Sequence, residues 1–340
     1  MLYETDLLII GAGPVGLFAA FQAGMLKIKC IVVDSLDAIG GQCAMLYPEK
    51  PIYDIPAYSM ITGNDLINKL YEQIKPFNQT IILNQKILDI ISDRDYLVKT
   101  QDAIFKTKSI VIATGGGNFT PNRPPLQNIQ DFEGKSVFYS VNNVSNFEDK
   151  TVVIAGGGDS AVDWAINLAC VAKHVYIVHR RDKFRAMQNS LEQLKDLINQ
   201  NKVEMIVPYQ LSSLNGNNGC LESVVVQNLD GEIKTLECDY LLPFFGIAMD
   251  HHELSSWNLN MTSDNKYIMV DPSTMEANLH KVFAIGDICQ YPGKLKLILT
   301  GFAEASLAVH TAFSRINPDT ALHFEHSTTK GIPKCNNHSK

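Results

Sequence analysis

The stretch that most constrains the fold of this chain is residues 6–34, DLLIIGAGPVGLFAAFQAGMLKIKCIVVD. A run of four apolar residues (7–10) is followed by a glycine turn and then by a helical pattern of small and apolar residues. A second apolar run (30–33) ends in an acid. This order predicts a strand, a tight turn, a helix and a second strand, the unit that binds dinucleotides in open α/β folds. A glycine turn by itself would be weak support, because such turns also occur for structural reasons.

Each glycine of this turn has a predicted role. Gly11 permits the tight turn, Gly13 lets the backbone approach a pyrophosphate, and Gly16 lets the helix pack against the strand. The N-terminus of the helix then faces the phosphates. Asp34 lies 18 residues after Gly16 and is placed to accept hydrogen bonds from a ribose hydroxyl.

The same pattern returns at residues 151–181, TVVIAGGGDSAVDWAINLACVAKHVYIVHRR. Its three small residues stand 145 positions after the three glycines of the first turn: Gly156, Gly158 and Ala161. The chain therefore contains an internal repeat, and two nucleotide-binding units are predicted.

The two units differ at the position of the acid. His179 stands where the first unit has Asp34, and Arg180 and Arg181 follow it, with Arg185 one turn later. A carboxylate would repel the 2′-phosphate of NADP, whereas guanidinium groups bind a phosphate through paired hydrogen bonds. The first unit is therefore expected to hold a nucleotide with a free ribose, and the second to hold NADP rather than NAD. The alternative interpretation of the arginines is a solvated helix start.

Length, charge and cysteine content limit the number of domains, the kind of partner and the cellular location that can be expected. With 340 residues, the chain is expected to form about two domains. The net charge of −7 argues against general nucleic-acid binding, which favours a basic face. No apolar run approaches the roughly 18 residues of a membrane span, and the first strand begins too close to Met1 for a signal peptide. The seven scattered cysteines are typical of reduced thiols, so a cytoplasmic location is expected.

The rest of the chain is expected to form further α/β structure. Residues 39–63 are rich in Gly, Pro and Tyr and have no sustained period, and long irregular segments in compact domains tend to be functional. The patterns predict the following elements: a helix over 65–77, β segments over 80–107, an apolar strand beginning at 109, a strand-rich region over 203–246, a buried strand at 282–287 and a helix over 300–315.

Several of these motifs together carry a family resemblance. The two nucleotide units, the ATG after one strand and the FAIGD near the end resemble the two-dinucleotide-binding-domain flavoproteins. The block GGGDSAVDWA…HRRDKFRA is similar to the NADPH domain of low-molecular-weight thioredoxin reductases. With GGQCAMLYPEKPIYDIP, the chain resembles the thioredoxin-reductase-like ferredoxin–NADP reductases over nearly its whole length.

The resemblance implies an architecture. The fold class is α/β, with two Rossmann-like (three-layer ββα) dinucleotide-binding domains and the NADP domain inserted in the FAD domain. The implied boundaries are an FAD domain of residues 1–120 and 247–329, an NADP domain of 121–246, and a C-terminal tail of 330–340. A homodimer with one FAD per chain and hydride exchange with NADP(H) are also implied.

The resemblance further implies contacts to FAD beyond the first turn. Gln42 would contact the cofactor near the pyrophosphate or flavin, and Tyr47 would stack on the isoalloxazine. The alternative for Tyr47 is a buried core tyrosine. Ile87 would contact adenine through its backbone, Phe119 would cover the flavin or diphosphate region, and Asp287 would hydrogen-bond the ribityl chain.

The C-terminal region has implied roles as well. A helix starting near Leu297 would aim its N-terminus at the flavin carbonyl. In this family a C-terminal extension reaches the flavin of the partner subunit, so that His326 is a candidate for stacking on the flavin and Thr328 is expected to touch FAD. No metal and no acid–base catalyst are expected. For NADP the resemblance implies seven contact residues: Gly156, Gly158, Ser160, His179, Arg180, Arg181 and Arg185.

Missing cysteines separate the chain from its disulfide-reducing relatives. Thioredoxin reductases carry a redox-active CxxC just ahead of the second glycine motif, where residues 138–150, FYSVNNVSNFEDK, contain no cysteine. Glutathione-reductase-like relatives place two cysteines after the GG of the FAD domain, where Cys43 has no partner. Without a dithiol, electrons cannot pass from the flavin to a protein disulfide, so they must leave FAD directly. Cys43 is interpreted as a packed thiol.

The predicted activity follows from this difference. A flavin takes up a hydride in one step and releases electrons singly, which suits an iron–sulfur protein or a flavodoxin as acceptor. The chain is therefore predicted to be a ferredoxin (or flavodoxin)–NADP+ oxidoreductase. The alternatives are a reductase of another acceptor, such as a quinone or a separate thiol protein, and a non-catalytic flavin redox sensor.

Overall fold

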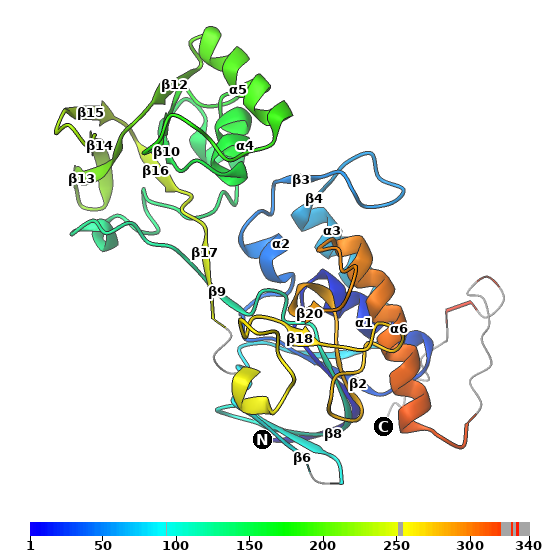
Figure 1. Cartoon of the computed structure of the whole chain (residues 1–340). Helices are drawn as coiled ribbons and strands as arrows, with labels where there is room; N and C mark the ends of the chain where they lie inside the picture. Colours follow the sequence, from blue (N-terminus) through cyan, green and yellow to red (C-terminus); the bar gives the residue numbers. More distant parts are fainter. Residues whose placement is uncertain (93, 251–253, 321–327, 329–330, 333–340) are drawn as a thin grey trace. The chain divides into compact units, whose positions relative to one another are not determined.

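A computed structural model describes residues 1–92, 94–250, 254–320, 328 and 331–332, with only the backbone described for 118–120, 247–250 and 254–255. The chain divides into two compact units (Figure 1), one formed by Met1–Asn118 with Met249–Lys340 and the other by Phe119–Ala248. The chain passes between them in β9 (Asn118–Pro121) and β17 (Ile247–Asp250), which pair with each other. No helix of the described residues is both long and apolar enough to cross a membrane.

The first unit is built on a mixed sheet in the order β5-β2-β1-β8-β7-β6, with β19 beside β8. Its strands are β1 (Leu2–Ile10), β2 (Cys30–Val33), β5 (Thr80–Ile82), β6 (Asp89–Ser92), β7 (Tyr96–Lys99), β8 (Ile104–Ile112) and β19 (Val282–Ala284). Residues 104–107 of β8 pair antiparallel with β7, and residues 110–112 pair parallel with β19. A strand from late in the chain therefore completes a sheet that begins at the N-terminus.

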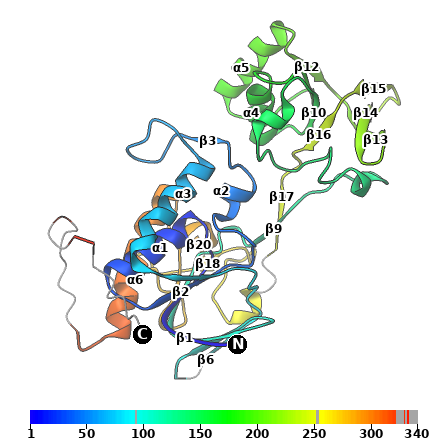
Figure 2. The same cartoon turned by 180° about the vertical axis from the view of Figure 1, so that it is seen from behind.

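Three helices gather on one side of the central strands of this sheet (Figures 1 and 2): α1 (Pro14–Met25), α3 (Gly63–Ile74) and α6 (Ile298–Ile316). Small residues of α1 and α6 allow close contacts. A Cβ atom on Gly24 would lie 2.3 Å from the ring of Phe77, and one on Gly301 would lie 2.4 Å from Cγ2 of Val15. The helices can therefore approach to distances that a larger residue at either position would prevent.

The segment between β2 and α3 has more structure than its sequence indicates. It contains a short helix, α2 (Gly41–Met45), and a two-stranded ribbon of β3 (Pro51–Ile52) and β4 (Ile61–Thr62). Thr62 then caps α3, because its Oγ1 accepts the Asp65 N–H at 3.1 Å. The remaining strands of the unit, β18 (Ile268–Met269) and β20 (Cys289–Gln290), pair in parallel.

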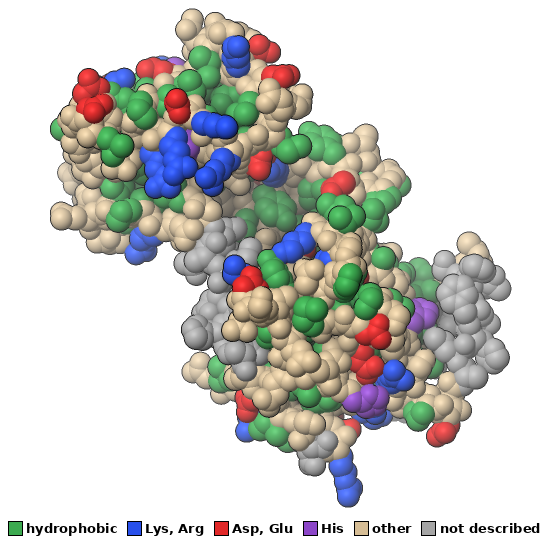
Figure 3. All heavy atoms as spheres, in the orientation of Figure 1, with side chains coloured by type: hydrophobic (Ala, Val, Ile, Leu, Met, Phe, Trp, Pro, Cys, Tyr) green, Lys and Arg blue, Asp and Glu red, His purple; other side chains and the backbone are tan. Residues whose placement is uncertain are grey.

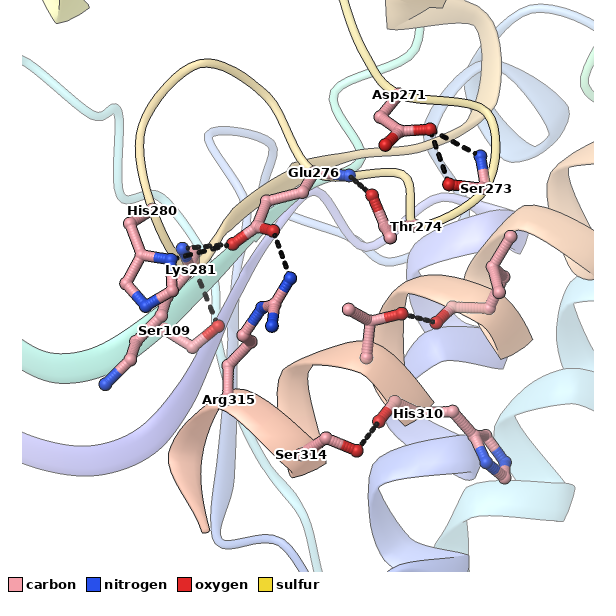
Figure 4. Close-up of polar contacts among 12 residues, drawn as sticks. Ser109, Asp271, Ser273, Thr274, Glu276, His280, Lys281, His310, Ser314 and Arg315 are labelled. Carbon is pink, nitrogen blue, oxygen red and sulfur yellow. Dashed lines mark hydrogen bonds and ion pairs between the residues drawn. The ribbon is translucent and has the colours of Figure 1, made fainter. Parts of the chain in front are cut away.

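The end of α6 is held by a carboxylate from outside the helix (Figure 4). Glu276 accepts the backbone N–H of Lys281 at 2.8 Å and pairs with Arg315 at 3.1 Å. The His280 Nδ1 atom lies 3.2 Å from the same carboxylate. The turn that leads into β19 is therefore tied to the last turn of α6.

The second unit has three layers. Its parallel sheet has the order β12-β11-β10-β16, with β10 (Thr151–Ala155), β11 (His174–Val178), β12 (Val203–Ile206) and β16 (Tyr240–Pro243). On one face Val152 and Ile154 share a core with α4 (Asp159–Leu168) and α5 (Gln188–Asn199). On the other face Val153 and Ala155 share a core with the antiparallel sheet of β13 (Gln210–Asn217), β14 (Cys220–Gln227) and β15 (Ile233–Glu237). Alternate residues of β10 thus belong to different cores, which explains its uninterrupted apolar sequence.

The contact between Gly24 and Phe77 yields a stability prediction. Alanine favours a helix interior over glycine by roughly 1 kcal/mol, yet the Cβ of Gly24→Ala would overlap the Phe77 ring. Overpacking should dominate, so we expect a loss of about 1–3 kcal/mol in the free energy of unfolding, measured by urea denaturation. In a Phe77→Leu background the same substitution should cost less. A neutral or stabilising effect of Gly24→Ala in the unaltered chain would contradict this packing.

Candidate functional site

The first glycine turn joins β1 to α1, and its three glycines have different surroundings. Gly11 has φ +112°, and a Cβ on it would lie 2.4 Å from the carbonyl oxygen of Ala113. A Cβ on Gly16 would lie 1.9 Å from the carbonyl oxygen of Gly11. Around Gly13 there is open space, with no atom of the described residues within 4 Å of such a Cβ. The fold itself therefore requires two of the glycines, while the third leaves room for a group to approach the backbone.

A second pair of glycines packs onto this turn. The Gly40 N–H donates to the carbonyl of Ala12 at 2.8 Å, and a Cβ on Gly41 would lie 3.3 Å from the Cα of Gly13. These contacts bring α2 and the half-buried Gln42 beside the first turn. Sequence analysis assigned Gln42 to the site through the resemblance, but not the packing that brings it there.

Asp34 connects the end of β2 to the same turn. Its Oδ2 accepts the Ala12 N–H at 2.6 Å and its Oδ1 accepts the Leu36 N–H at 2.9 Å. The residue is 9% exposed, and this burial raises the pKa of the carboxyl, opposed by the hydrogen bonds from the Leu36 and Ala12 amides. Asp34 thus holds the turn in addition to its predicted contact with a ribose, a structural role that sequence reasoning missed.

Cys43, Tyr47 and Asp287 come together in the first unit. The Cys43 thiol is 1% exposed and donates to the Tyr47 hydroxyl at 3.4 Å. Burial, the largest cause, raises the pKa of both groups, and the negative charge of Asp287 raises it further. The exposed Asp287 carboxylate therefore lies within electrostatic range of both side chains. The burial of Cys43 fits a packed thiol.

Two helix N-termini meet beside these residues. Val15, in the first turn of α1, packs against both Gly286 and Gly301, the latter in the first turn of α6. Helix α6 begins directly after its N-cap Leu297, as predicted, and within the described part of the chain neither it nor α1 has a side-chain cap. Their first N–H groups and the positive ends of both dipoles are therefore available to an anionic or carbonyl-bearing ligand.

One buried hydroxyl supports a bound group at this place. Thr114 belongs to the ATG that follows β8, next to the glycine turn. Its Oγ1 is buried and has no hydrogen-bond partner among the described residues. Since buried polar groups are almost always paired, a ligand atom is a suitable partner for this hydroxyl. The donor set of the first unit therefore fits a phosphate-bearing cofactor.

For the other residues predicted to contact FAD, the structure shows only their exposure or their backbone. The side chain of Ile87 is 5% exposed, which is compatible with a contact through its backbone. The backbone of Phe119 lies in β9, and its side chain is not described. Thr328 is exposed, and His326 lies outside the described residues. Their contacts with FAD stay predictions.

The second glycine turn repeats the geometry of the first. A Cβ on Gly156 would lie 2.5 Å from the carbonyl oxygen of Phe244, whereas Gly158 has open space around it. Gly158 is the N-cap of α4, and Ala161 is fully buried where the first turn has Gly16. Ser160 is exposed in the first turn of this helix. The repeat found in the sequence is therefore also a repeat of backbone structure.

A cavity of about 640 Å³ opens over this turn. It brings together most of the residues predicted to bind NADP, and Ser160 is the one that does not line it. Figure 3 shows Lys and Arg side chains gathered on this unit. The lining consists of Gly156–Gly158, Val178–Arg181, Lys183, Arg185, Tyr209–Leu211, Phe244–Gly246, Pro124, Pro125 and Ala155. Sequence reasoning missed Lys183, although it stands in the same basic run, and it had no signal for Tyr209–Leu211.

His179 packs directly on the glycine turn. A Cβ on Gly157 would lie 2.3 Å from its Nε2 atom, and its ring centroid lies 5.2 Å from that of Phe184. Burial lowers the pKa of His179, and the charges of Arg180 and Arg181 lower it further. The imidazole is therefore neutral at pH 7, and the positive charge of the pocket comes from its arginines and lysine. Among the described residues, no group of His, Cys, Asp or Glu is arranged to hold a metal ion.

Comparisons with known proteins agree with this geometry. A family model described as pyridine nucleotide-disulphide oxidoreductase matches residues 5–312. A protein named "Ferredoxin--NADP reductase" from Rickettsia rickettsii (strain Iowa) is 52% identical over 335 residues, 98% of each chain. A protein of the same name from Rickettsia bellii (strain OSU 85-389) is 53% identical over 331 residues, 97% of this chain and 99% of the relative.

Solved structures support the same fold. A thioredoxin reductase from Lactococcus lactis (FR conformation) has a TM-score of 0.74 at 26% identity and covers 92% of this chain and 99% of its own. A thioredoxin reductase from T. acidophilum has a TM-score of 0.75 at 22% identity, covers 92% of this chain and 98% of its own, and shows the fold alone. The predicted two-domain α/β flavoprotein fold is confirmed, and with it the use of a flavin and a pyridine nucleotide. The chain belongs to the pyridine nucleotide-disulphide oxidoreductase family and, within it, to the thioredoxin-reductase-like ferredoxin–NADP reductases.

Proposed function

We propose that the protein is an FAD-dependent ferredoxin (or flavodoxin)–NADP+ oxidoreductase that works as a homodimer. The observation that carries the proposal is the presence of two nucleotide-binding turns in a chain without a dithiol at either family position. Cys43 is a buried cysteine without a disulfide, and its thiol donates a hydrogen bond to the Tyr47 hydroxyl. Residues 138–150 contain no cysteine. Electrons arriving from the coenzyme must therefore leave the flavin for an external acceptor. The printed names of the relatives point to ferredoxin, and flavodoxin and a cytoplasmic location stay predictions.

The first unit, Met1–Asn118 with Met249–Lys340, is assigned to FAD. The open backbone at Gly13 and the N-terminus of α1 would receive the pyrophosphate, and Asp34 the adenosine ribose. The unpartnered hydroxyl of Thr114 would donate to the cofactor, Asp287 would hold the ribityl chain, and Tyr47 would cover the ring and exclude water. When bound, FAD supplies the two-electron to one-electron exchange, so these residues bind and orient rather than transfer protons.

The second unit, Phe119–Ala248, is assigned to NADP(H). Its arginines would fork onto the 2′-phosphate, with Lys183 as a further cation in the same cavity. The open backbone at Gly158 would receive the pyrophosphate at the N-terminus of α4. His179 contributes by packing on Gly157 without the negative charge that Asp34 brings to the first unit.

Coenzyme preference tests the second unit. Replacing Arg180 and Arg181 together with alanine should raise the KM for NADPH and leave that for NADH nearly unchanged. Each lost contact to the phosphate costs roughly 1.5–3 kcal/mol, which is about tenfold to a hundredfold. Steady-state kinetics with both coenzymes measures this. Lys195→Ala with Lys202→Ala is the matched control, because it removes two exposed cations of the same unit that do not line the cavity. Equal losses with NADPH and NADH would mean that the arginines serve the fold.

Electron counting tests the direct route from the flavin. The flavin extracted from the purified protein should be FAD, and anaerobic titration should deliver about two electrons per chain. A flavin acting with a disulfide would take up about four. Alkylation of the NADPH-reduced protein should leave activity intact, because reduction generates no reactive thiolate. Extraction of FMN, uptake of four electrons or inactivation by alkylation only after reduction would each refute the mechanism.

A comparison of acceptors tests the partner. NADPH should support reduction of ferredoxin and flavodoxin, and thioredoxin should not be reduced, because no dithiol links the flavin to a disulfide substrate. The measurement is steady-state turnover with the three proteins and a quinone, side by side. Faster turnover with the quinone or with thioredoxin would favour another reductase. Turnover with none of them would favour a redox sensor.

A further inference from the structure

The first unit contains a buried ion pair to which neither the sequence motifs nor the proposed function assigns a role. Glu304 lies in the second turn of α6 and Lys294 in the segment before that helix. Their side chains are 3% and 1% exposed, and the two charged groups are in direct contact. A buried ion pair is a poor source of stability, since desolvation of both charges offsets their attraction. Its contacts therefore call for another explanation.

The Glu304 carboxylate uses both oxygens to hold one short segment, residues 286–294. Its Oε2 accepts the backbone N–H of Gly286 at 2.8 Å and is approached by the Cys289 Sγ at 3.5 Å. Its Oε1 accepts the Tyr291 hydroxyl at 2.6 Å and the Lys294 ammonium. Burial, with a smaller contribution from the negative charge of Glu304, raises the pKa of Cys289 to about 12. One side chain thus fixes both ends of the segment.

Each end of this segment presents a part of the first nucleotide site. At one end, Gly286 has φ +75°, and the residue that follows it is Asp287, the carboxylate near Cys43 and Tyr47. At the other end, three residues after Lys294, stands Leu297, the N-cap of α6. Glu304 therefore sets the position of Asp287 and that of the α6 N-terminus relative to each other.

We infer that Glu304 is a positioning residue of the flavin site and that Lys294 is its counter-charge. The carboxylate fixes the Gly286–Asp287 turn, and the ammonium balances its charge. The inference rests on the proposed function, because it takes FAD as the group that Asp287 and the α6 N-terminus contact. On this inference Glu304 acts through the segment that it holds.

Two double variants separate positioning from folding. Lys294→Met with Glu304→Gln removes both charges and keeps an oxygen that can accept the Gly286 N–H. Lys294→Met with Glu304→Met removes the charges and that acceptor as well. Replacing a buried pair with uncharged residues of similar volume is often close to neutral for stability, so both should fold. The Kd for FAD should stay within about threefold in the Gln variant and rise about tenfold or more in the Met variant. The bound flavin should show a shifted absorption spectrum and midpoint potential only in the Met variant.

Glu276→Gln is the matched control (Figure 4). Glu276 also holds a backbone N–H and a cation of α6, but at Arg315, 11 residues and about 16 Å further along the helix. It should alter the unfolding midpoint without changing the Kd for FAD. If the double Met variant does not fold, Lys294→Met with Glu304→Ala decides, since it also lacks a side-chain acceptor for the Gly286 N–H. Its Kd for FAD must then exceed that of Glu276→Gln about tenfold.

The outcomes are distinct. Equal FAD affinity and flavin spectra in both double variants, or equal losses in both, would overturn the inference, because the acceptor at position 304 would then make no difference. Equal FAD affinity of Glu276→Gln and of Lys294→Met with Glu304→Ala would overturn it as well. Failure of the unaltered protein to bind FAD would instead refute the proposed function. Failure of the inference is therefore measured on the variants, and failure of the proposed function on the unaltered protein.

Discussion

The close approach of backbones at the first glycine turn is the constraint on which the nucleotide site depends. A Cβ atom at Gly11 or Gly16 would lie within 2.4 Å of a backbone carbonyl oxygen. The end of β1, the start of α1 and the end of β8 are therefore in close contact. This contact leaves Gly13 facing open space and sets α1 where Val15 meets α6. The starts of α1 and α6 and the Thr114 hydroxyl, which have no side-chain partner among the residues that the structure describes, then surround one place. Binding groups from distant parts of the chain converge because the packing leaves them no other arrangement.

The two turns have similar backbone packing but a different side chain beside the middle residue: a carboxylate in the first and an imidazole in the second. In the first, the middle residue is Ala12, whose N–H is accepted by Asp34 at 2.6 Å. In the second, the middle residue is Gly157, and the neutral ring of His179 packs where an alanine Cβ would stand. The pairs Ala12 with Asp34 and Gly157 with His179 therefore belong together, and exchanging one member alone would leave either an unpaired amide or a steric overlap. The proposed difference in coenzyme between the two units therefore involves the turn as well as the arginines.

Much of the fold could be predicted from the sequence because its signals are local. A glycine turn, the helix after it and the strand that ends in Asp34 lie within 29 residues, and the repeat at 151–181 has the same compactness. The missed contacts connect residues far apart in the chain. No local sequence pattern indicates that the Gly40 N–H donates to the Ala12 carbonyl or that Glu304 accepts the Gly286 N–H. The same holds for Tyr209, which lines the cavity together with Arg180. Such contacts depend on strand order and helix packing, which the periodicity of one segment does not contain.

The division of β8 between two neighbours has a consequence for how the chain folds as it is made. Its second half pairs with β19, so that the sheet of the first unit lacks a strand until residues 282–284 have been synthesised. The second unit is continuous, from Phe119 to Ala248, and holds all the strands of its own sheet. On a ribosome that releases the chain from its N-terminus, the inserted unit can therefore complete its core while the outer unit still waits for its last strand. Domain insertion thus lets the unit in the middle of the chain complete its sheet before the unit that contains the N-terminus.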